Sequence, residues 1–271
     1  MSKRAMTKGY LDLPHIVSIM ATCGRHTLAE RAMKMWIDQD YEGNHTLLIF
    51  NNSEVKTELD PGLKLDDNQQ IILWNNHIDT STGEPYTSLG AIYNDALKFL
   101  NDIPAQDSLV GHFDIVTHHD DDDLYMPNHL TQGMLGMEAA KKMGMEGYKP
   151  QASWYRHKGG LVKMENNMEP SVFLTWTALN QRGYSDTTTE QHLQWYGSMM
   201  EEKKIFVDPK GESTLIYNWG DTIPTYKTSG DFKNPMNFNN VRKSSYDHGD
   251  KMFTPWPDDS VKPYYDAIRD Q

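Results

Sequence analysis

The chain has 271 residues, of which 38% are hydrophobic and 24% charged, a composition that suits one large folded domain or one domain with an appendage. It has no apolar run near the length needed to cross a bilayer, and Cys23 is its single cysteine, which excludes an integral membrane segment and an internal disulfide framework. The net charge of −12 falls on residues 1–140, which hold 9 Lys and Arg against 21 Asp and Glu, whereas residues 141–271 are balanced.

The first 140 residues alternate short apolar runs with helical patterns. The runs that predict β-strands are Ile16–Met20, Thr46–Phe50, Ile71–Trp74 and Phe113–Thr117. The helical patterns begin at Thr27, cover Ser88–Leu100, and follow Pro127 as far as Gly144. Thr27 and Glu30 have the spacing of a capping box. This order predicts an α/β layer with a mostly parallel sheet, in which ligands bind at the carboxyl ends of the strands.

The second half is less regular. Ser171–Leu179 and Leu215–Trp219 predict strands, and Thr187–Met200 predicts a helix. Residues 221–271 are rich in Pro, Gly, Asn, Asp and Lys, which is typical of loops. The stretch Lys141–Met164 carries six basic residues against Glu146, which indicates either a solvated surface or a face that meets an anionic acceptor.

The most informative string is HHDDDDLYMPNHL, residues 118–130, which directly follows a predicted strand. Four consecutive carboxylates repel one another, so a fold that gathers them at a strand end needs a compensating charge. A divalent cation such as Mg²⁺ or Mn²⁺ supplies that charge and prefers oxygen ligands. The alternative is a solvated acidic turn, which the flanking strand and the helix after Pro127 make less favourable.

This string resembles the aspartate-any-aspartate motif of family 2 glycosyltransferases, whose usual form is "DADDIYLPNHL". The resemblance implies the GT-A fold, and a metal held by Asp120 and Asp122 with Asp123 close behind. Asp120 and Asp121 would also contact the nucleotide sugar. It further implies a catalytic domain over residues 1–220, with a nucleotide-sugar half at 1–140 and an acceptor half at 141–220. Residues 221–271 would form an irregular extension packed on it.

The opening strand, turn and helix resemble the donor pocket of the same family. The turn ATCGR takes the place of "PTYNR", and the resemblance implies donor contacts from its members Ala21, Thr22, Cys23 and Arg25. A helix that begins after such a turn offers free N–H groups to phosphates, and Arg25 adds a permanent charge. IFNNSE stands where the family has "DDGS", which implies that Asn51 and Asn52 meet the base. LGAIYNDALKFL resembles "GxxxARNxG", in which Asn94 matches the asparagine and Tyr93 replaces an arginine.

Inverting sugar transfer needs a general base for the acceptor hydroxyl. The string RGYSDTTTEQHLQW, residues 182–195, resembles the family's "GFDE" turn and the acidic pair after it. Since Gln191 replaces the second acid, the resemblance implies Glu190 or Asp186 as the base. His248, in SSYDHGD, is the candidate for a histidine that ligates the metal.

The sequence thus predicts a cytoplasmic, metal-dependent glycosyltransferase with a UDP-sugar donor. The acceptor alternatives are a glycan, a lipid-linked glycan, and hydroxymethylated DNA of the phage type. The replacements at Asn51, Tyr93 and Gln191 keep open a catalytically inactive protein that binds a nucleotide sugar or a glycan. A nucleotidyltransferase would share the metal chemistry, but ATCGRHT is a poor match for its Gly-rich phosphate loop.

Overall fold

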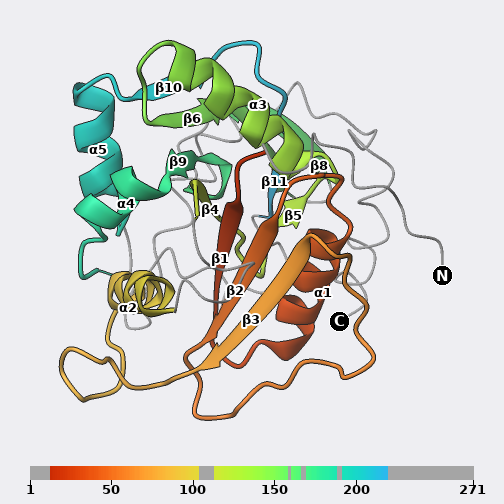
Figure 1. Cartoon of the computed structure of the whole chain (residues 1–271), viewed down its shortest axis with the longest axis vertical. Helices are drawn as coiled ribbons and strands as arrows, with labels where there is room; N and C mark the ends of the chain where they lie inside the picture. Colours follow the sequence, from red (N-terminus) through yellow and green to blue (C-terminus); the bar gives the residue numbers. More distant parts are fainter. Residues whose placement is uncertain (1–12, 104–112, 158–159, 166–168, 188–190, 219–271) are drawn as a thin grey trace.

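A computed structural model describes residues 13–103, 113–157, 160–165, 169–187 and 191–218 (Figure 1). These residues form an α/β structure around a seven-stranded sheet with the order β10-β6-β9-β4-β1-β2-β3. The strands are β1 (Ile16–Thr22), β2 (His45–Asn51), β3 (Gln69–Asn75), β4 (Ile115–His118), β6 (Gly147–Pro150), β9 (Phe173–Thr175) and β10 (Ile205–Asp208).

The sheet is mostly parallel, as the alternating pattern predicts. β1 pairs in parallel with β2 and β4, β2 with β3, and β6 with β10. The exception is β9, which is antiparallel to both β4 and β6 and so links the two parallel groups. β1 and β2 are buried along their whole length, which explains why their sequences are continuous apolar runs.

A second sheet of four strands has the order β5-β11-β7-β8. Its strands are β5 (Leu124–Tyr125), β7 (Ala152–His157), β8 (Gly160–Glu165) and β11 (Leu215–Asn218). β5 immediately follows the acidic string, and β11 pairs with it in the antiparallel direction. This sheet therefore joins the acidic string to β11, which begins only at Leu215, far along the chain.

Helices cover both faces of the main sheet (Figure 1). They are α1 (His26–Ile37), α2 (Leu89–Asp102), α3 (His129–Lys142), α4 (Trp176–Arg182) and α5 (Leu193–Glu201). Alternate residues of β1 point to opposite faces: Val17 and Ile19 pack with α2, α4 and α5, whereas Met20 packs with α1 and the second sheet. The core thus lies in two layers, one on each side of the sheet.

Two local expectations are wrong. The apolar run Ser171–Leu179 is a strand only over β9, because the Thr175 hydroxyl accepts a hydrogen bond from Ala178 N (3.3 Å) and starts α4. Thr27 and Glu30 form no capping box, since the helix begins earlier, with Arg25 at the N-cap, and Glu30 pairs with Lys34 instead. A short apolar run does not by itself distinguish a strand from a buried helix.

The described helices include none with the length and apolar character required to span a bilayer. The extension expected at residues 221–271 lies outside the described residues.

Candidate functional site

The carboxyl ends of β1, β2 and β3 lie in register at one edge of the main sheet. Thr22 pairs with Asn51, and Asn51 pairs with Asn75. β4 ends at the same edge, since Ile19 of β1 is opposite His118 and accepts a hydrogen bond from His119 N (3.0 Å). The turns that carry the candidate donor and metal residues therefore converge here, where ligands bind in parallel sheets.

Three of the four aspartates form a cluster at this edge. Asp120, Asp122 and Asp123 each offer a carboxylate oxygen, and these oxygens lie within 4.8 Å of one another. Hard oxygen donors at this spacing fit Mn²⁺ or Mg²⁺, which typically take one or two protein carboxylates together with substrate phosphates. The donor set thus fits the metal that the motif implies.

The fourth aspartate, Asp121, points inward and is fully buried. Its Oδ1 lies 2.5 Å from Nη2 of Arg25, whose Nη1 also approaches Asp122 Oδ2 at 3.5 Å. Burial raises the pKa of Asp121 to about 6, although the charge of Arg25 lowers it. Burial lowers the pKa of Arg25, but the charges of Asp121 and Asp122 outweigh it and raise that pKa overall. Arg25 thus neutralises the one carboxylate of the string that lies outside the cluster of Asp120, Asp122 and Asp123.

The backbone of the acidic string is held from behind by two buried side chains. Arg31 of α1 donates from Nη2 to the carbonyl oxygens of Asp121 (2.9 Å) and Asp123 (3.3 Å). The hydroxyl of Tyr125 accepts a hydrogen bond from Asp120 N (2.6 Å). His119 stacks on Tyr125 with a centroid distance of 3.8 Å. The residues around the motif are therefore packing partners that fix its backbone.

The turn after β2 is built around Asn51. Its Nδ2 donates to Val55 O and Asn75 Oδ1, both at 2.8 Å, and its Oδ1 accepts from Gly24 N (3.3 Å) and Ser53 N (3.2 Å). The side chain is completely buried, and its four hydrogen bonds match what an amide can form. Asn51 therefore shapes the turn, and contact with a base would require it to exchange one of these bonds.

The other donor candidates lie around this turn with different exposure. Ala21 and Thr22 are buried, Asn52 is half-buried, and Cys23 is exposed. Gly24 has φ +65, and a Cβ there would lie 3.1 Å from Ser53 Oγ, so a glycine suits this position better than the family's asparagine. Cys23, Asn52 and the guanidinium of Arg25 are thus the parts of the turn that a nucleotide can reach.

Helix α2 connects the acidic cluster to the turn that resembles "GFDE". Tyr93 donates a hydrogen bond to Asp120 Oδ1 (3.2 Å), and its ring stacks on Tyr184 at a centroid distance of 4.9 Å. Asn94 binds the backbone of Tyr184 twice, accepting from its N–H (2.8 Å) and donating to its carbonyl (2.9 Å). A Cβ on Gly90 would come within 1.7 Å of Ser185 O, so the contact of helix and turn requires a glycine. Tyr93, where the family has arginine, thus ties the acidic cluster to this turn.

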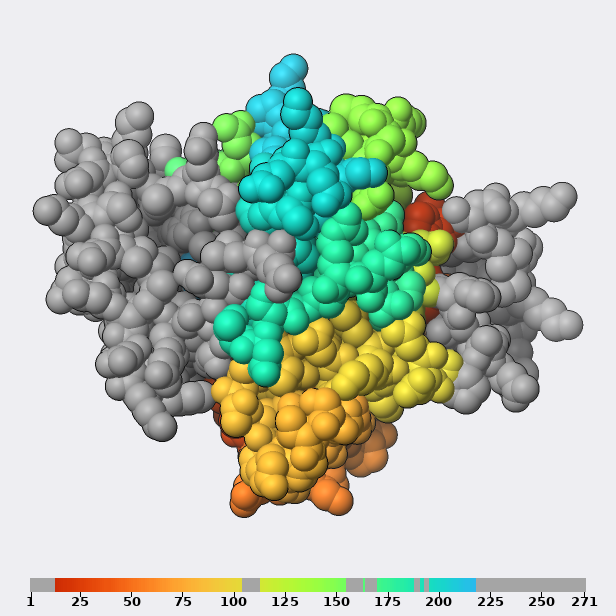
Figure 2. Space-filling view, turned by 90° about the vertical axis from the view of Figure 1, so that its left-hand side faces the viewer, coloured from red at the N-terminus to blue at the C-terminus, as the bar shows by residue number. Residues whose placement is uncertain are grey.

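Asp186 lies at the other side of the turn. It is exposed, and the hydroxyl of Ser88, the N-cap of α2, donates to its Oδ1. It borders a cavity of about 450 Å³ between α2, the loop after β3 and the end of α4, on the face shown in Figure 2. The polar side chains of this cavity are Asp79, Ser81, Asn94, Asp95, Lys98, Asn101, Asn180 and Asp186. Its volume is in the usual range of small-molecule sites.

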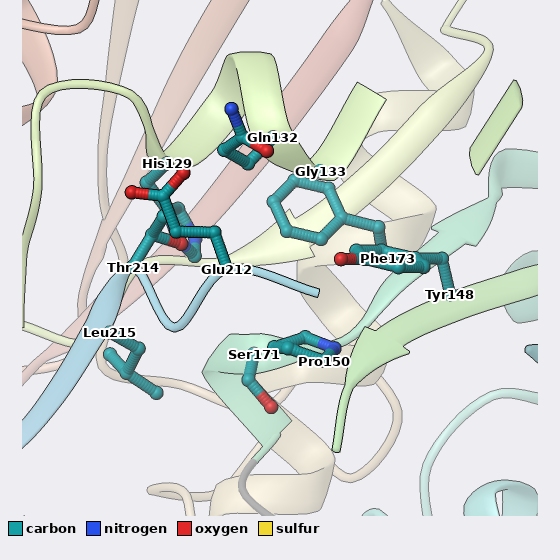
Figure 3. A pocket seen from close by; sticks show the side chains of 10 residues that line it. All are labelled: His129, Gln132, Gly133, Tyr148, Pro150, Ser171, Phe173, Glu212, Thr214 and Leu215. Carbon is teal, nitrogen blue, oxygen red and sulfur yellow. The ribbon is translucent and has the colours of Figure 1, made fainter. Parts of the chain in front are cut away.

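A second pocket, between α3, β6 and the segment before β11, is shown in Figure 3. It has no room for a water molecule. Gly133 lies against the ring of Phe173, so that a Cβ there would approach the ring to 2.2 Å. This pocket is a packing gap, and it holds no candidate residue.

Two candidates, Glu190 and His248, lie outside the described residues. The residues that sequence reasoning missed are Arg31, Tyr125 and Tyr184. Arg31 had a detectable signal, because it is a charged residue on the same helical face as Leu28 and Met35. The roles of the two tyrosines depend on contacts between distant segments, which no local pattern reveals.

The fold, with the acidic cluster at the carboxyl edge of its main sheet, is of the GT-A type. The sequence matches no protein-family model and no curated protein sequence. Similarity is found among solved structures. TarS 1-349 of S. aureus in complex with UDP-GlcNAc has a TM-score of 0.53 at 10% identity, over 78% of this chain and 60% of that one. A mannosyltransferase, PcManGT from Pyrobaculum calidifontis in complex with GDP-Man and Mn²⁺, has a TM-score of 0.52 at 10% identity, over 79% of this chain and 59% of that one.

The chain thus spans about three fifths of the length of these two structures. At such low identity the similarity concerns the fold alone, and it confirms the GT-A resemblance inferred from the acidic string. The activity, donor and acceptor of this chain are a separate question.

Proposed function

We propose that the protein is a glycosyltransferase that moves a sugar from a UDP-sugar donor to an acceptor hydroxyl with the help of Mn²⁺ or Mg²⁺. The observation that carries the proposal is the convergence of Asp120, Asp122 and Asp123 within 4.8 Å at the carboxyl edge of a GT-A sheet. Structures of the same fold in complex with UDP-GlcNAc, or with GDP-Man and Mn²⁺, support the kind of ligand. The single cysteine suits a reducing compartment, and we place the reaction in the cytoplasm.

The donor would lie over the turns after β1 and β2. Asn52 and Cys23 are accessible from this side, and Arg25 would supply a positive charge to the diphosphate. When bound, the divalent ion would neutralise negative charge on the diphosphate leaving group, with Asp122 and its neighbours as ligands. Asp121 would remain paired with Arg25 and keep that guanidinium oriented.

The general base comes, in this proposal, from the segment of residues 183–191, with Glu190 or Asp186 in the role. Asp186 accepts a hydrogen bond from the hydroxyl of Ser88, which orients its carboxylate. Asn94 and the stacked ring of Tyr93 fix the turn relative to the acidic cluster. Replacing each acid separately, D186N and E190Q, tests the assignment: the base variant loses transfer while UDP binding persists.

We propose a glycan, free or lipid-linked, as the acceptor in preference to hydroxymethylated DNA. The cavity beside α2 is lined by the exposed carboxylate of Asp186 together with Asp79 and Asp95, against the ammonium of Lys98, which pairs with the buried Asp95 (2.9 Å). Carboxylates and amides hydrogen-bond sugar hydroxyls, but they repel the phosphates on which DNA affinity depends. In the basic stretch, Lys149 is buried and donates to Tyr196 (3.3 Å), so it offers no charge to an anionic acceptor.

The decisive experiment measures UDP release from a panel of UDP-sugars with Mn²⁺ or Mg²⁺, for the wild type and D122A. Slow hydrolysis of one donor that vanishes in D122A supports the proposal. Metal-dependent UDP binding without release from any donor favours the second candidate, a catalytically inactive nucleotide-sugar-binding protein, which the engagement of Asn51 within its own turn motivates. Absence of both sinks the transferase proposal.

A further inference from the structure

The guanidinium of Arg31 lies directly behind the acidic string, in the core between α1 and the main sheet. The residue is 7% exposed, and its neighbours on α1 include the buried Leu28, Ala32 and Met35. Burial lowers the pKa of Arg31 overall, although the charges of Asp122, Asp121 and Asp123 act in the opposite direction. A buried charge is costly to a fold unless nearby groups stabilise it, so its place here requires an explanation.

The contacts of Arg31 surround Asp122. One nitrogen, Nη2, donates both to Asp121 O (2.9 Å) and to Asp123 O (3.3 Å), the carbonyls on either side of that residue. The other donors, Nε and Nη1, are buried and have no hydrogen-bond partner in the part of the chain that the structure describes. If this arginine served stability alone, more of its N–H groups would be hydrogen-bonded. An apolar side chain of similar size would also fill the space without the cost of removing a charge from water.

The charge of Arg31 differs in role from that of Arg25. Arg25 approaches the carboxylates of Asp121 and Asp122 from the ligand side, with 18% of its side chain exposed. Arg31 binds the backbone of the string from the core side. The string is thus held between two arginines. Arg25 contacts its carboxylates, whereas Arg31 contacts its backbone carbonyls.

We propose that Arg31 is a positioning residue for the metal site, a role that rests on the proposed metal-dependent function. By binding both carbonyls that flank Asp122, it fixes the backbone from which that carboxylate projects. Its charge also lowers the repulsion among Asp120, Asp122 and Asp123, so the three carboxylates converge before a cation arrives. Groups that orient metal ligands in this way typically contribute about 10- to 100-fold to metal affinity.

The test measures Mn²⁺ binding by the full-length protein without any donor, from the electron paramagnetic resonance signal of free Mn²⁺. The variants are R31M, which keeps the buried volume, and R31K, which keeps the charge and one donor site. The matched control is R182M, because Arg182 also donates to a backbone carbonyl, Ala178 O (3.1 Å), and pairs with Glu202 away from the acidic string. We expect R31M to weaken Mn²⁺ binding about 10- to 100-fold, R31K to recover part of the loss, and R182M to bind as the wild type does.

The melting temperature of each variant with and without Mn²⁺ gives a second readout, since the metal-induced rise reports affinity even in a less stable protein. A folded R31M that binds Mn²⁺ as tightly as the wild type overturns the inference. Failure of both R31M and R31K to fold also overturns it, in favour of a purely structural arginine. Wild-type Mn²⁺ binding that depends on Arg31, without UDP release from any donor, leaves the inference standing and sinks the transferase proposal. UDP release that persists in EDTA, together with no Mn²⁺ binding, overturns this inference and the metal dependence of the proposed function, but leaves sugar transfer itself standing.

Discussion

Nη2 of Arg25 lies 2.5 Å from Oδ1 of Asp121, the fully buried member of the four-aspartate string. The string that it resembles has alanine at the position of Asp121, so this chain carries an additional buried carboxylate together with the guanidinium that neutralises it. The other three carboxylates form the cluster whose spacing fits a cation. The pairing has measurable consequences for stability and for donor binding.

Removing one partner of this pair should lower the free energy of unfolding more than removing both partners does. R25M leaves Asp121 buried without its counter-charge, for which we expect a loss of about 3 kcal/mol in the free energy of unfolding. The double variant R25M/D121A should recover much of that loss. Urea unfolding of the two single variants and the double variant measures the coupling. Additive losses would show that the pair does not act as a unit.

Tyr93 should matter for the metal site through its hydroxyl alone. Y93F removes the hydrogen bond to Asp120 (3.2 Å) and keeps the ring stack, so we expect Mn²⁺ affinity to fall about 3- to 10-fold with little change in stability. Y86F is the matched control, because Tyr86, in the loop after β3, also donates to an aspartate, Asp95 of α2 (2.7 Å). Equal Mn²⁺ affinities in Y93F and the wild type would contradict the role.

Gly90 should be essential for the turn at residues 183–187. A Cβ in G90A would meet Ser185 O at 1.7 Å and displace the turn that carries Asp186. We therefore expect transfer to the acceptor to fall at least about 10-fold, while UDP and Mn²⁺ binding at the sheet edge persist. G197A, in α5, has no atom within 4 Å of the new Cβ and should be neutral or stabilising by about 0.5 kcal/mol. Similar transfer rates in both variants would show that the turn tolerates displacement.

Stability should fall as the pH drops below neutral. Burial lowers the pKa of both His119 and His129 to about 3, from 6.5 in the unfolded chain. Between these two values the unfolded state therefore binds more protons than the folded state. The contribution is fully present above pH 6.5 and is lost as the pH falls toward 3, at about 2 kcal/mol per histidine by pH 5. The raised pKa of Asp121 acts in the opposite direction but by less.

Urea unfolding at pH 7, 6 and 5 measures this dependence. In H129N the titrating group is absent, so the slope between pH 6.5 and 5 should decrease by about one proton. If the slope of the variant equals that of the wild type, folding does not lower the pKa of His129.

The sequence by itself determined the central strands and the acidic string. β1 and β2 are continuous apolar runs because parallel strands in the middle of a sheet are buried on both faces, and such runs can be recognised without knowing which strands are neighbours. The position of Asp120, Asp122 and Asp123 after a strand was likewise local information, and it was sufficient to indicate the metal cluster and the GT-A fold.

Only the tertiary structure decided which polar groups face the ligand and which serve the fold. Asn51 and Asp121 read as ligand contacts, yet the first is saturated within its turn and the second is buried against Arg25. Likewise, the sequence does not show that Arg31 holds the string, or that β9 ends where α4 begins. The physical reason is that periodicity is local, whereas the direction of a side chain at a strand end depends on partners brought there from distant parts of the chain.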